Sequence, residues 1–189
     1  MQIMNKNLND YIFRLEKVIP HNVCDDTVNE LKEKTFTKHT YSTGVGNEFS
    51  FDNDLSVRYD STLLTYFYLM QICYESLRNY HKFINFDWYD HWTGYTEIRF
   101  NKYDQGTEMK KHCDHIRSVF DGKVKGVPIL TILGSLNDNY EGGQLILFDD
   151  DVIEFNKGDI IIFPSNFLYP HQVSSVTRGT RFSFVSWSY

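Results

Sequence analysis

Apolar side chains in the N-terminal half recur at the spacing of amphipathic helices. The clearest run predicts a helix over Ser61–Phe83, whose broad apolar face would comprise Leu63, Leu64, Phe67, Met70, Ile72, Tyr74 and Leu77. A shorter helix is predicted to run to about Lys34 from Asp25 or Asp26, since either aspartate can act as its N-cap. Both helices are expected to pack on the outside of the rest of the chain.

The remainder of this half carries weaker signals. Tyr11–Ile19, closed by Pro20, predicts a first strand. Thr35–Asp60 contains two glycines and several Asn and Asp residues, and it predicts loops and short strands.

After Gly94 short apolar runs separated by turn residues replace the helical spacing. They predict strands over Tyr95–Tyr103, Ile129–Leu136, Gln144–Phe148, Asp159–Phe163 and Arg181–Trp187. Because no helical pattern lies between these runs, they favour an antiparallel sandwich or barrel, of which the jelly roll is one form. We therefore predict one domain over residues 1–189, with helical and irregular support in 1–93 and a β core in 94–189.

Composition narrows the class of protein. The chain has 189 residues, 41% of them hydrophobic, so it can bury a substantial core. Its 19 Lys and Arg against 25 Asp and Glu give a net charge of −6, which argues against a nucleic-acid groove. Met1–Pro20 is too polar for a signal peptide, and no apolar run approaches the ~20 residues of a membrane helix. Three scattered cysteines without a C-x-x-C pair fit a reducing compartment, so we expect a cytoplasmic protein.

The first chemical signal is the tripeptide His112-Cys113-Asp114. Side chains alternate between the two faces of a strand, so His112 and Asp114 would share one face while Cys113 and His115 point away. An imidazole and a carboxylate at this spacing can chelate one metal ion. Alone the tripeptide is a weak signal, because it is equally compatible with an exposed polar strand end.

A second histidine, His171, follows the predicted strand that ends at Phe163. Two His and one carboxylate leave coordination positions open, which is the facial triad of non-haem Fe(II) oxygenases. Zinc accepts the same ligand types, but the helical H-E-x-x-H of zinc proteases is absent from the sequence.

Arg181 lies ten residues after His171. The intervening Arg178-Gly179 is predicted to turn a hairpin, which would place Arg181 on the strand paired with the one that His171 begins. A guanidinium there could hold the distal carboxylate of a diacid bidentately, with the hydroxyl of Ser183 on the same face.

In combination these motifs resemble the 2-oxoglutarate/Fe(II)-dependent dioxygenase superfamily, in its prolyl 4-hydroxylase-like branch. Besides the three ligands and Arg181, the resemblance rests on Arg99-x-x-x-Tyr103-x-x-Gly106, on Leu136-Asn137 followed by Glu141-Gly-Gly-Gln-Leu145, on Gly158-Asp-Ile-Ile-Ile-Phe163-Pro, and on His171-x-Val173-x-x-Val176-Thr-x-Gly179-x-Arg181. It covers roughly Tyr95 to Tyr189. The sequence departs from the family pattern at Gln144, where Glu is commoner, and at Leu133-Gly-Ser135, which is less aromatic than usual.

The resemblance implies a double-stranded β-helix (jelly roll) core and a set of site residues. His112, Asp114 and His171 would hold Fe(II), and Arg181 would pair with the C5 carboxylate of 2-oxoglutarate, with Tyr103 and Ser183 as supporting donors. The implied reaction consumes O₂ and 2-oxoglutarate, hydroxylates an unactivated C–H bond, and yields succinate and CO₂. The resemblance is also compatible with ascorbate as a further cofactor.

The substrate stays open between several alternatives. A prolyl residue of a peptide or protein is the leading reading, ahead of a free amino acid or other small metabolite. Nucleobase oxidation is disfavoured by the net charge, and a non-catalytic jelly-roll binding module by the presence of all four site residues. The loops 85–94 and 115–127 are expected to decide the substrate, whereas His21, His39, His81 and His91 are expected to be structural.

Overall fold

The computed structural model describes residues 7–42, 48–88, 92–114 and 127–189. Its largest sheet has seven strands in the order β1 (Phe13–Leu15), β12 (Ile160–Pro164), β8 (Leu130–Ser135), β15 (Arg181–Ser188), β6 (Arg99–Tyr103), β5 (Ser56–Tyr59) and β2 (Thr37–Lys38). A second sheet has the order β11 (Asp151–Ile153), β10 (Leu145–Leu147), β13 (His171–Val173) and β7 (Met109–His112). Two-stranded pairs join β14 (Val176–Arg178) to β9 (Glu141–Gly142), and β3 (Tyr41–Ser42) to β4 (Glu48–Phe49).

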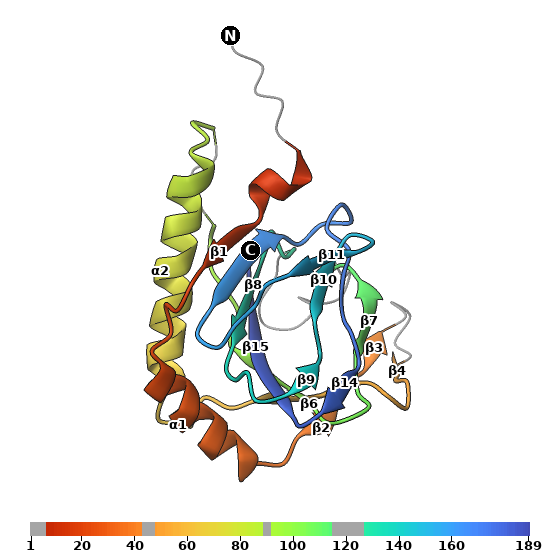
Figure 1. The fold of residues 1–189 in the computed structure, drawn as a ribbon. Helices are drawn as coiled ribbons and strands as arrows, with labels where there is room; N and C mark the ends of the chain where they lie inside the picture. Colours follow the sequence, from red (N-terminus) through yellow and green to blue (C-terminus); the bar gives the residue numbers. More distant parts are fainter. Residues whose placement is uncertain (1–6, 43–47, 89–91, 115–126) are drawn as a thin grey trace.

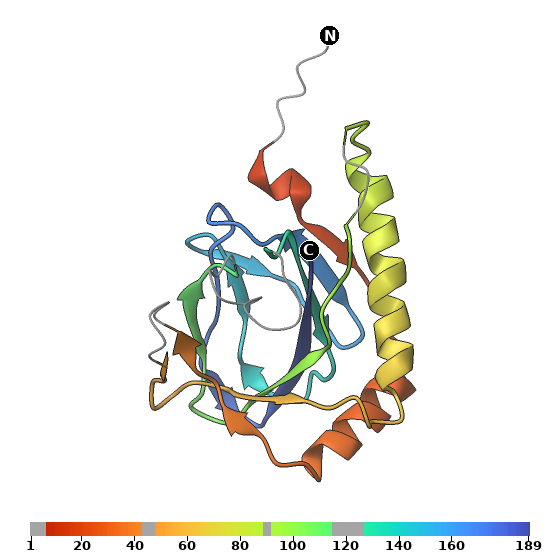
Figure 2. The same cartoon turned by 180° about the vertical axis from the view of Figure 1, so that it is seen from behind.

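The helices lie along one side of these sheets (Figures 1 and 2). They are α1 (His21–Lys32) and α2 (Tyr66–Ile84), preceded by the 3-10 turn η1 (Leu8–Tyr11). In the part of the chain that the structure describes, no helix combines the length and the apolarity needed to cross a membrane.

Strand alternation divides the buried side chains into two clusters. In β12, Ile160 and Ile162 face the cluster shared with α1 and α2, while Ile161 and Phe163 face the cluster between the two sheets. The inner cluster draws on β6, β7, β10, β12 and β13, so the two sheets face one another across it. This mostly β fold with helices packed outside confirms the predicted jelly roll.

Some predicted boundaries were wrong in the N-terminal half. The second helix begins at Tyr66 and not at Ser61, because the Asp60 carboxylate accepts hydrogen bonds from the backbone N–H and the hydroxyl of Thr62 and holds that stretch in turns. Its predicted apolar face is also too broad, since Leu64 is 90% exposed and Phe67 78% exposed.

The first helix and first strand were also misplaced. The helix begins at His21, directly after Pro20, whose fixed φ suits a helix start. The strand is only Phe13–Leu15, since Lys17 adopts a left-handed φ of 52°. The assignment of residues 1–189 to a single domain stays a prediction.

A buried carboxylate fixes β1 to the edge of the large sheet. Asp159 is 1% exposed, and its oxygens accept hydrogen bonds from the Arg14 guanidinium (2.8 and 3.1 Å) and from the backbone N–H groups of Lys17 and Asn156 (2.9 Å each). The N-terminal segment therefore depends on one side chain that lies far from it in the sequence.

Asp159→Ala should lower the free energy of unfolding by about 2–4 kcal/mol, because it leaves charge-assisted hydrogen bonds unmade inside the protein. Denaturant unfolding measures this change. Asp25→Ala is the matched control: Asp25 makes an ion pair with Lys157 but is 60% exposed, so its loss should cost less than about 1 kcal/mol. Equal losses in the two variants would contradict the role given to Asp159.

Candidate metal centre and anion pocket

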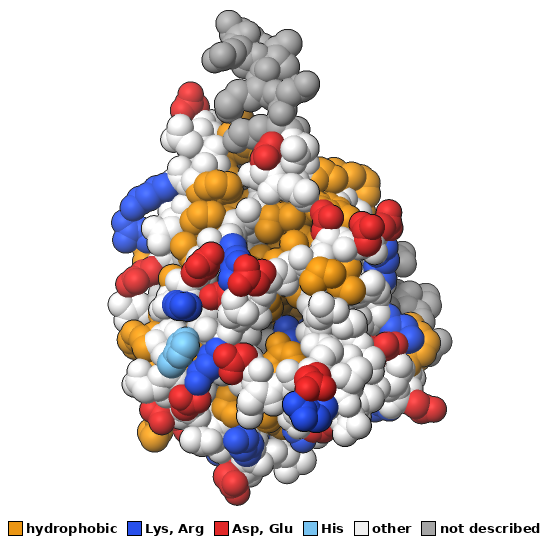
Figure 3. Space-filling view, in the orientation of Figure 1, with side chains coloured by type: hydrophobic (Ala, Val, Ile, Leu, Met, Phe, Trp, Pro, Cys, Tyr) orange, Lys and Arg blue, Asp and Glu red, His pale blue; other side chains and the backbone are white. Residues whose placement is uncertain are grey.

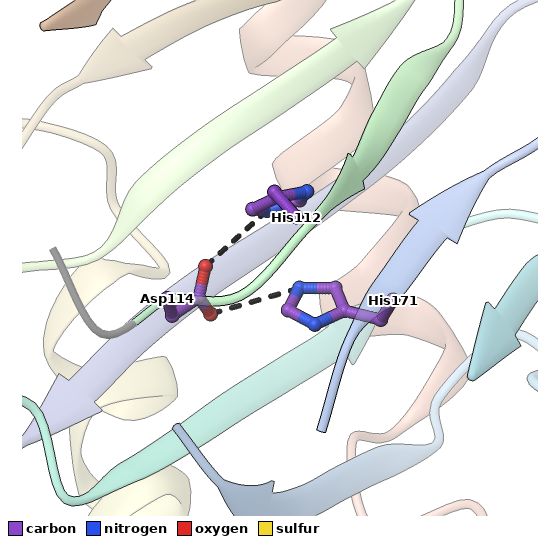
Figure 4. A group of neighbouring side chains, drawn as sticks. All are labelled: His112, Asp114 and His171. Carbon is purple, nitrogen blue, oxygen red and sulfur yellow. Dashed lines mark ion pairs between the residues drawn. The ribbon is translucent and has the colours of Figure 1, made fainter. Parts of the chain in front are cut away.

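Three side chains predicted as metal ligands lie together between the two sheets. His112 ends β7, and its direct partner in the neighbouring strand is His171, the first residue of β13. Asp114 Oδ1 lies 3.3 Å from His112 Nε2, and Asp114 Oδ2 lies 3.7 Å from His171 Nε2. Figure 4 shows the two imidazoles and the carboxylate turned toward one another. All three ligand atoms lie within 4.8 Å of one another, close enough to bind a single ion.

The path of the chain to Asp114 differs from the prediction. Strand alternation was expected to carry both His112 and Asp114, but β7 ends at His112 and Asp114 lies in a bend. The bend returns the carboxylate toward the imidazoles, so the residues meet for a different reason. Cys113 Sγ is not part of the group, while His115 lies outside the described residues.

Backbone carbonyls determine which nitrogen of each imidazole is available to a metal. His112 Nδ1 lies 2.7 Å from the Lys110 carbonyl oxygen, and His171 Nδ1 lies 3.1 Å from that of Tyr169. A carbonyl can only accept, so each Nδ1 must carry the proton and donate it. The lone pair is then on Nε2, the atom that faces Asp114, which is the arrangement of a metal-binding histidine.

The protonation states of the buried groups also favour a cation. Burial of His171 lowers its pKa to about 4, so its imidazole is neutral at pH 7. Burial alone would raise the pKa of Asp114, but the neighbouring His171 and His112 and the hydrogen bond from Trp187 hold it well below its ordinary value. A carboxylate and two imidazole lone pairs therefore converge, and a divalent cation satisfies all three.

A shell of hydrogen bonds orients the Asp114 carboxylate. Its Oδ2 accepts a 2.8 Å bond from the Thr131 hydroxyl and a 2.9 Å bond from the Trp187 indole N–H. Thr131 is itself bonded to the Ser165 hydroxyl at 2.8 Å. With Oδ2 occupied by these donors, Oδ1 is left to face a metal.

Trp187→Phe should weaken metal binding by about 10- to 100-fold, because the ring is kept while the donor that orients Asp114 is lost. Metal titration at equilibrium measures the affinity. Trp88→Phe is the control, since Trp88 is 77% exposed and is not among the residues that line the metal site. Unchanged affinity in Trp187→Phe would mean that the indole does not orient the ligand.

A buried arginine lies in the same cavity as His112, Asp114 and His171. Arg181 is 2% exposed, and its Nη1 donates a 3.0 Å hydrogen bond to the Ser183 hydroxyl. Its guanidinium carbon lies 4.8 Å from the centroid of the Tyr103 ring. Among the described residues no carboxylate forms an ion pair with Arg181, and its Nε has no hydrogen-bond partner. A buried guanidinium in this condition is suited to receive an anionic ligand.

The predicted hairpin between His171 and Arg181 was wrong. The strand β14 that precedes Gly179 pairs with β9, while Arg181 begins β15, which lies between β6 and β8 in the larger sheet. The two residues are thus on facing sheets and not on paired strands. Because facing sheets enclose the cavity, Arg181 can approach a ligand that also reaches His171.

The glycine pair of the sequence motif makes room for Arg181. Gly143 has a φ of 60°, and a Cβ on it would lie 3.0 Å from Arg181 Cδ. A side chain there would be strained in conformation and would press on the arginine. This close approach explains why a glycine occupies the position.

The structure adds residues that the sequence did not single out for the site. Thr131 and Trp187 were predicted only as members of the strands Ile129–Leu136 and Arg181–Trp187. Strand alternation, which turns Thr131 toward the interior, was the sequence signal that could have placed this residue in the site. His39 was expected to be structural, and this stays a prediction; burial, followed by the charges of Arg99 and His112, lowers its pKa to about 4. Residues 89–91 and 115–126 of the predicted substrate loops lie outside the described residues.

Comparison with known proteins gives one family match. Residues 98–189 match the family model of the 2OG-Fe(II) oxygenase superfamily. Among curated relatives, a PKHD-type hydroxylase of Delftia acidovorans is 35% identical over 97 residues, which are 48% of this chain and 42% of the relative. One of Shewanella oneidensis is 37% identical over 92 residues, 47% of this chain and 40% of the relative. The chain thus spans less than half the length of these relatives.

Solved structures resemble the fold over nearly the whole chain. A prolyl hydroxylase of Trichoplax adhaerens, in complex with a peptide fragment of the hypoxia inducible factor oxygen degradation domain, has a TM-score of 0.72 at 18% identity and covers 96% of this chain and 85% of that one. A prolyl-4-hydroxylase of Pseudomonas putida has a TM-score of 0.65 at 16% identity, covering 96% and 95%. At these identities the likeness concerns the fold alone.

Proposed function

We propose that this chain, whose residues 98–189 match the family model of the 2OG-Fe(II) oxygenase superfamily, is a 2-oxoglutarate- and Fe(II)-dependent dioxygenase that hydroxylates an unactivated C–H bond. The family resemblance drawn from the sequence motifs is thereby confirmed. Because the chain spans less than half of the curated relatives it matches, its own activity and substrate rest on the geometry of the site.

One observation carries the proposal: a metal-binding triad lines the same cavity as a buried arginine that has no carboxylate partner among the residues that the structure describes. His112, Asp114 and His171 fit Fe(II) in their atom types and spacing, and they leave coordination positions open. Arg181, with Ser183 and Tyr103 beside it, fits the distal carboxylate of 2-oxoglutarate. Zinc-dependent hydrolysis does not require a buried arginine such as Arg181 beside the metal.

The roles of the protein's own groups follow from their positions. Fe(II) and 2-oxoglutarate, when bound, supply the oxidising chemistry, with succinate and CO₂ as co-products. Thr131 and Trp187 hold the Asp114 carboxylate in place, and the two backbone carbonyls hold the imidazoles. Arg181 orients the co-substrate by its far end, and the buried side chains around the cavity exclude water.

A prolyl residue of a peptide or protein is the proposed target. The proteins of similar fold include prolyl hydroxylases, one of them solved with a peptide, which supports this choice. On the face seen in Figure 3, Lys and Arg side chains are interspersed with Asp and Glu, and such a face offers no continuous basic surface for nucleic acid. A free amino acid or other small metabolite is the second candidate, and Arg99, a half-buried guanidinium that lines the same cavity, favours one that carries a carboxylate.

The test is succinate formation from 2-oxoglutarate with Fe(II) under air, with and without proline-containing peptides. We expect slow succinate formation alone and a marked increase with a suitable substrate. A chain that neither binds 2-oxoglutarate nor forms succinate is not a dioxygenase, and the binding-module alternative then stands.

A further inference from the structure

A second arginine faces the metal site from another strand. Arg99 is the first residue of β6 and pairs with Val185 of β15. The next residue, Phe100, packs into the cluster beneath the helices, so alternation turns Arg99 inward with Asn101 and Tyr103. Arg99 lines the same cavity as the metal-binding triad and is half-buried.

The guanidinium of Arg99 lies against a side chain that touches a metal ligand. Its central carbon is 5.0 Å from the centroid of the Trp187 ring, and the Trp187 indole N–H is bonded to Asp114. Arg99 Nε donates a 3.1 Å hydrogen bond to the Asn101 side-chain oxygen. Stacking on an aromatic face leaves the in-plane N–H groups of a guanidinium free to donate, so the Nη groups can bind a ligand.

Arg99 has no acidic partner among the described residues. Arg14, Arg58 and Arg178 each form an ion pair with a carboxylate, but none is recorded for Arg99. Asp114 lies in the same cavity, but its carboxylate is engaged by the two imidazoles, Thr131 and Trp187. The protein carries a net charge of −6, so a shortage of carboxylates does not explain the lack of a partner.

The neighbouring His39 does not offset or compete with the positive charge of Arg99. Burial, with the positive charge of Arg99 second, lowers the pKa of the neighbouring His39 to about 4. His39 is therefore neutral at pH 7 and does not compete with Arg99 for an anion. Of the described residues that line this cavity, Asp114 is the only one with a carboxylate, so an anionic group that enters meets the Arg99 guanidinium and no acidic side chain other than the metal ligand.

Arg99 and Arg181 lie toward different ends of the cavity. Arg181 of β15 pairs with Tyr103 of β6. Arg99 lies four residues before Tyr103 on β6, so the Cα atoms of Arg99 and Tyr103 are about 13 Å apart. A diacid held by Arg181 at one end and by the metal at the other satisfies Arg181 and leaves Arg99 unpaired. The half-buried guanidinium of Arg99 is then available to bind a second carboxylate.

We propose that Arg99 binds a carboxylate of the substrate, so that the molecule hydroxylated carries a carboxylate close to the target carbon. This inference rests on the proposed function and narrows its substrate class to a free amino acid or small acid, or to a peptide with a terminal or side-chain carboxylate next to its target residue. The Asn101 side-chain oxygen accepts the hydrogen bond from Arg99 Nε, and the Trp187 ring packs against the face of the guanidinium. Arg99 is a binding residue for the substrate, separate from the co-substrate arginine.

The experiment compares each acid with its amide. Wild-type protein with Fe(II) and 2-oxoglutarate is given the free amino acids and their amides, and proline-containing tripeptides with a C-terminal carboxylate or amide. Succinate formation above the substrate-free rate is measured. Acids should stimulate it and amides should not. Stimulation by free amino acids identifies a small substrate, and stimulation by tripeptide acids alone identifies a peptide terminus.

Variants then test the residue. Arg99→Met keeps the aliphatic length and should raise KM for the stimulating acid by about 10- to 100-fold while kcat changes much less, since charge-assisted hydrogen bonds are lost on binding. Arg99→Lys should recover part of the affinity. Arg78→Met is the matched control, because Arg78 is exposed on α2 and forms no ion pair with any residue that the structure describes.

Three results would overturn the inference: amides that stimulate as well as acids, no stimulation by any acid, or an unchanged KM in Arg99→Met. A fourth is a loss of 2-oxoglutarate affinity in Arg99→Met equal to the rise in substrate KM, since Arg99 would then hold the co-substrate. Failure of the proposed function is distinct, because there the wild-type protein itself does not bind 2-oxoglutarate.

Discussion

Arg181→Met should abolish useful 2-oxoglutarate binding while leaving metal affinity and stability intact. A bidentate pair between a guanidinium and a carboxylate makes two charge-assisted hydrogen bonds, and their loss should weaken binding by about 100-fold or more. The side chain lies opposite Tyr103 and is not among the metal-ligating atoms, so the triad should be unaffected. Calorimetric titration of 2-oxoglutarate, without oxygen and with Fe(II) present, measures the change.

The stability of Arg181→Met distinguishes a binding role from a structural one. Removing one member of a buried ion pair leaves the other charge unpaired, but Arg181 has no carboxylate partner among the described residues. Methionine in its place removes an unpaired buried charge, so the unfolding midpoint should be unchanged or higher. A marked fall in stability, or loss of metal with 2-oxoglutarate affinity kept, would refute the assignment.

His171→Ala should remove bound Fe(II) and reduce succinate formation to background, by about 1,000-fold or more, since several kcal/mol of metal-dependent stabilisation are lost. His171 is 5% exposed and supplies one of only three protein ligands in the group. Metal content after dialysis and the rate of succinate formation are the two measurements.

The control for this variant is His21→Ala, in which an exposed imidazole on α1 is removed. It should retain both metal and activity. A far-ultraviolet circular dichroism spectrum like that of the wild type shows that His171→Ala is folded, and Asp114→Asn provides a second test that leaves no cavity. Full metal content in folded His171→Ala would exclude His171 from the ligand set.

Local patterns in the sequence predicted the larger features of the fold because those patterns are themselves physical causes. Alternating apolar runs after Gly94 specify strands with one face on each cluster, as Ile160–Phe163 show. The predicted helix over Ser61–Phe83 was too long, because apolar spacing does not reveal that Leu64 and Phe67 remain exposed. That outcome depends on which surface the helix meets.

The prediction that the strand of Arg181 pairs with the strand of His171 was wrong, again because local sequence patterns do not determine long-range packing. Arg178-Gly179 is a good turn signal, and a hairpin was its simplest consequence. The chain instead passes from one sheet to the other, so that Phe182 and Phe184 join the cluster beneath the helices. Strand partners far apart in the sequence are selected by this burial, which no local signal encodes.

The sequence by itself determined which chemical groups are present: two histidines, one aspartate and an arginine at family-like spacing, and hence the expected metal and co-substrate. It could do so because ligand preference is a property of the side chain. Only the tertiary structure decided that Thr131 and Trp187 orient Asp114 and that Arg181 faces His171 across the two sheets. It also decided that Arg99 enters the cavity with no carboxylate partner among the described residues. Those facts depend on how distant strands are paired and packed, and packing also decides which charges are left unpaired.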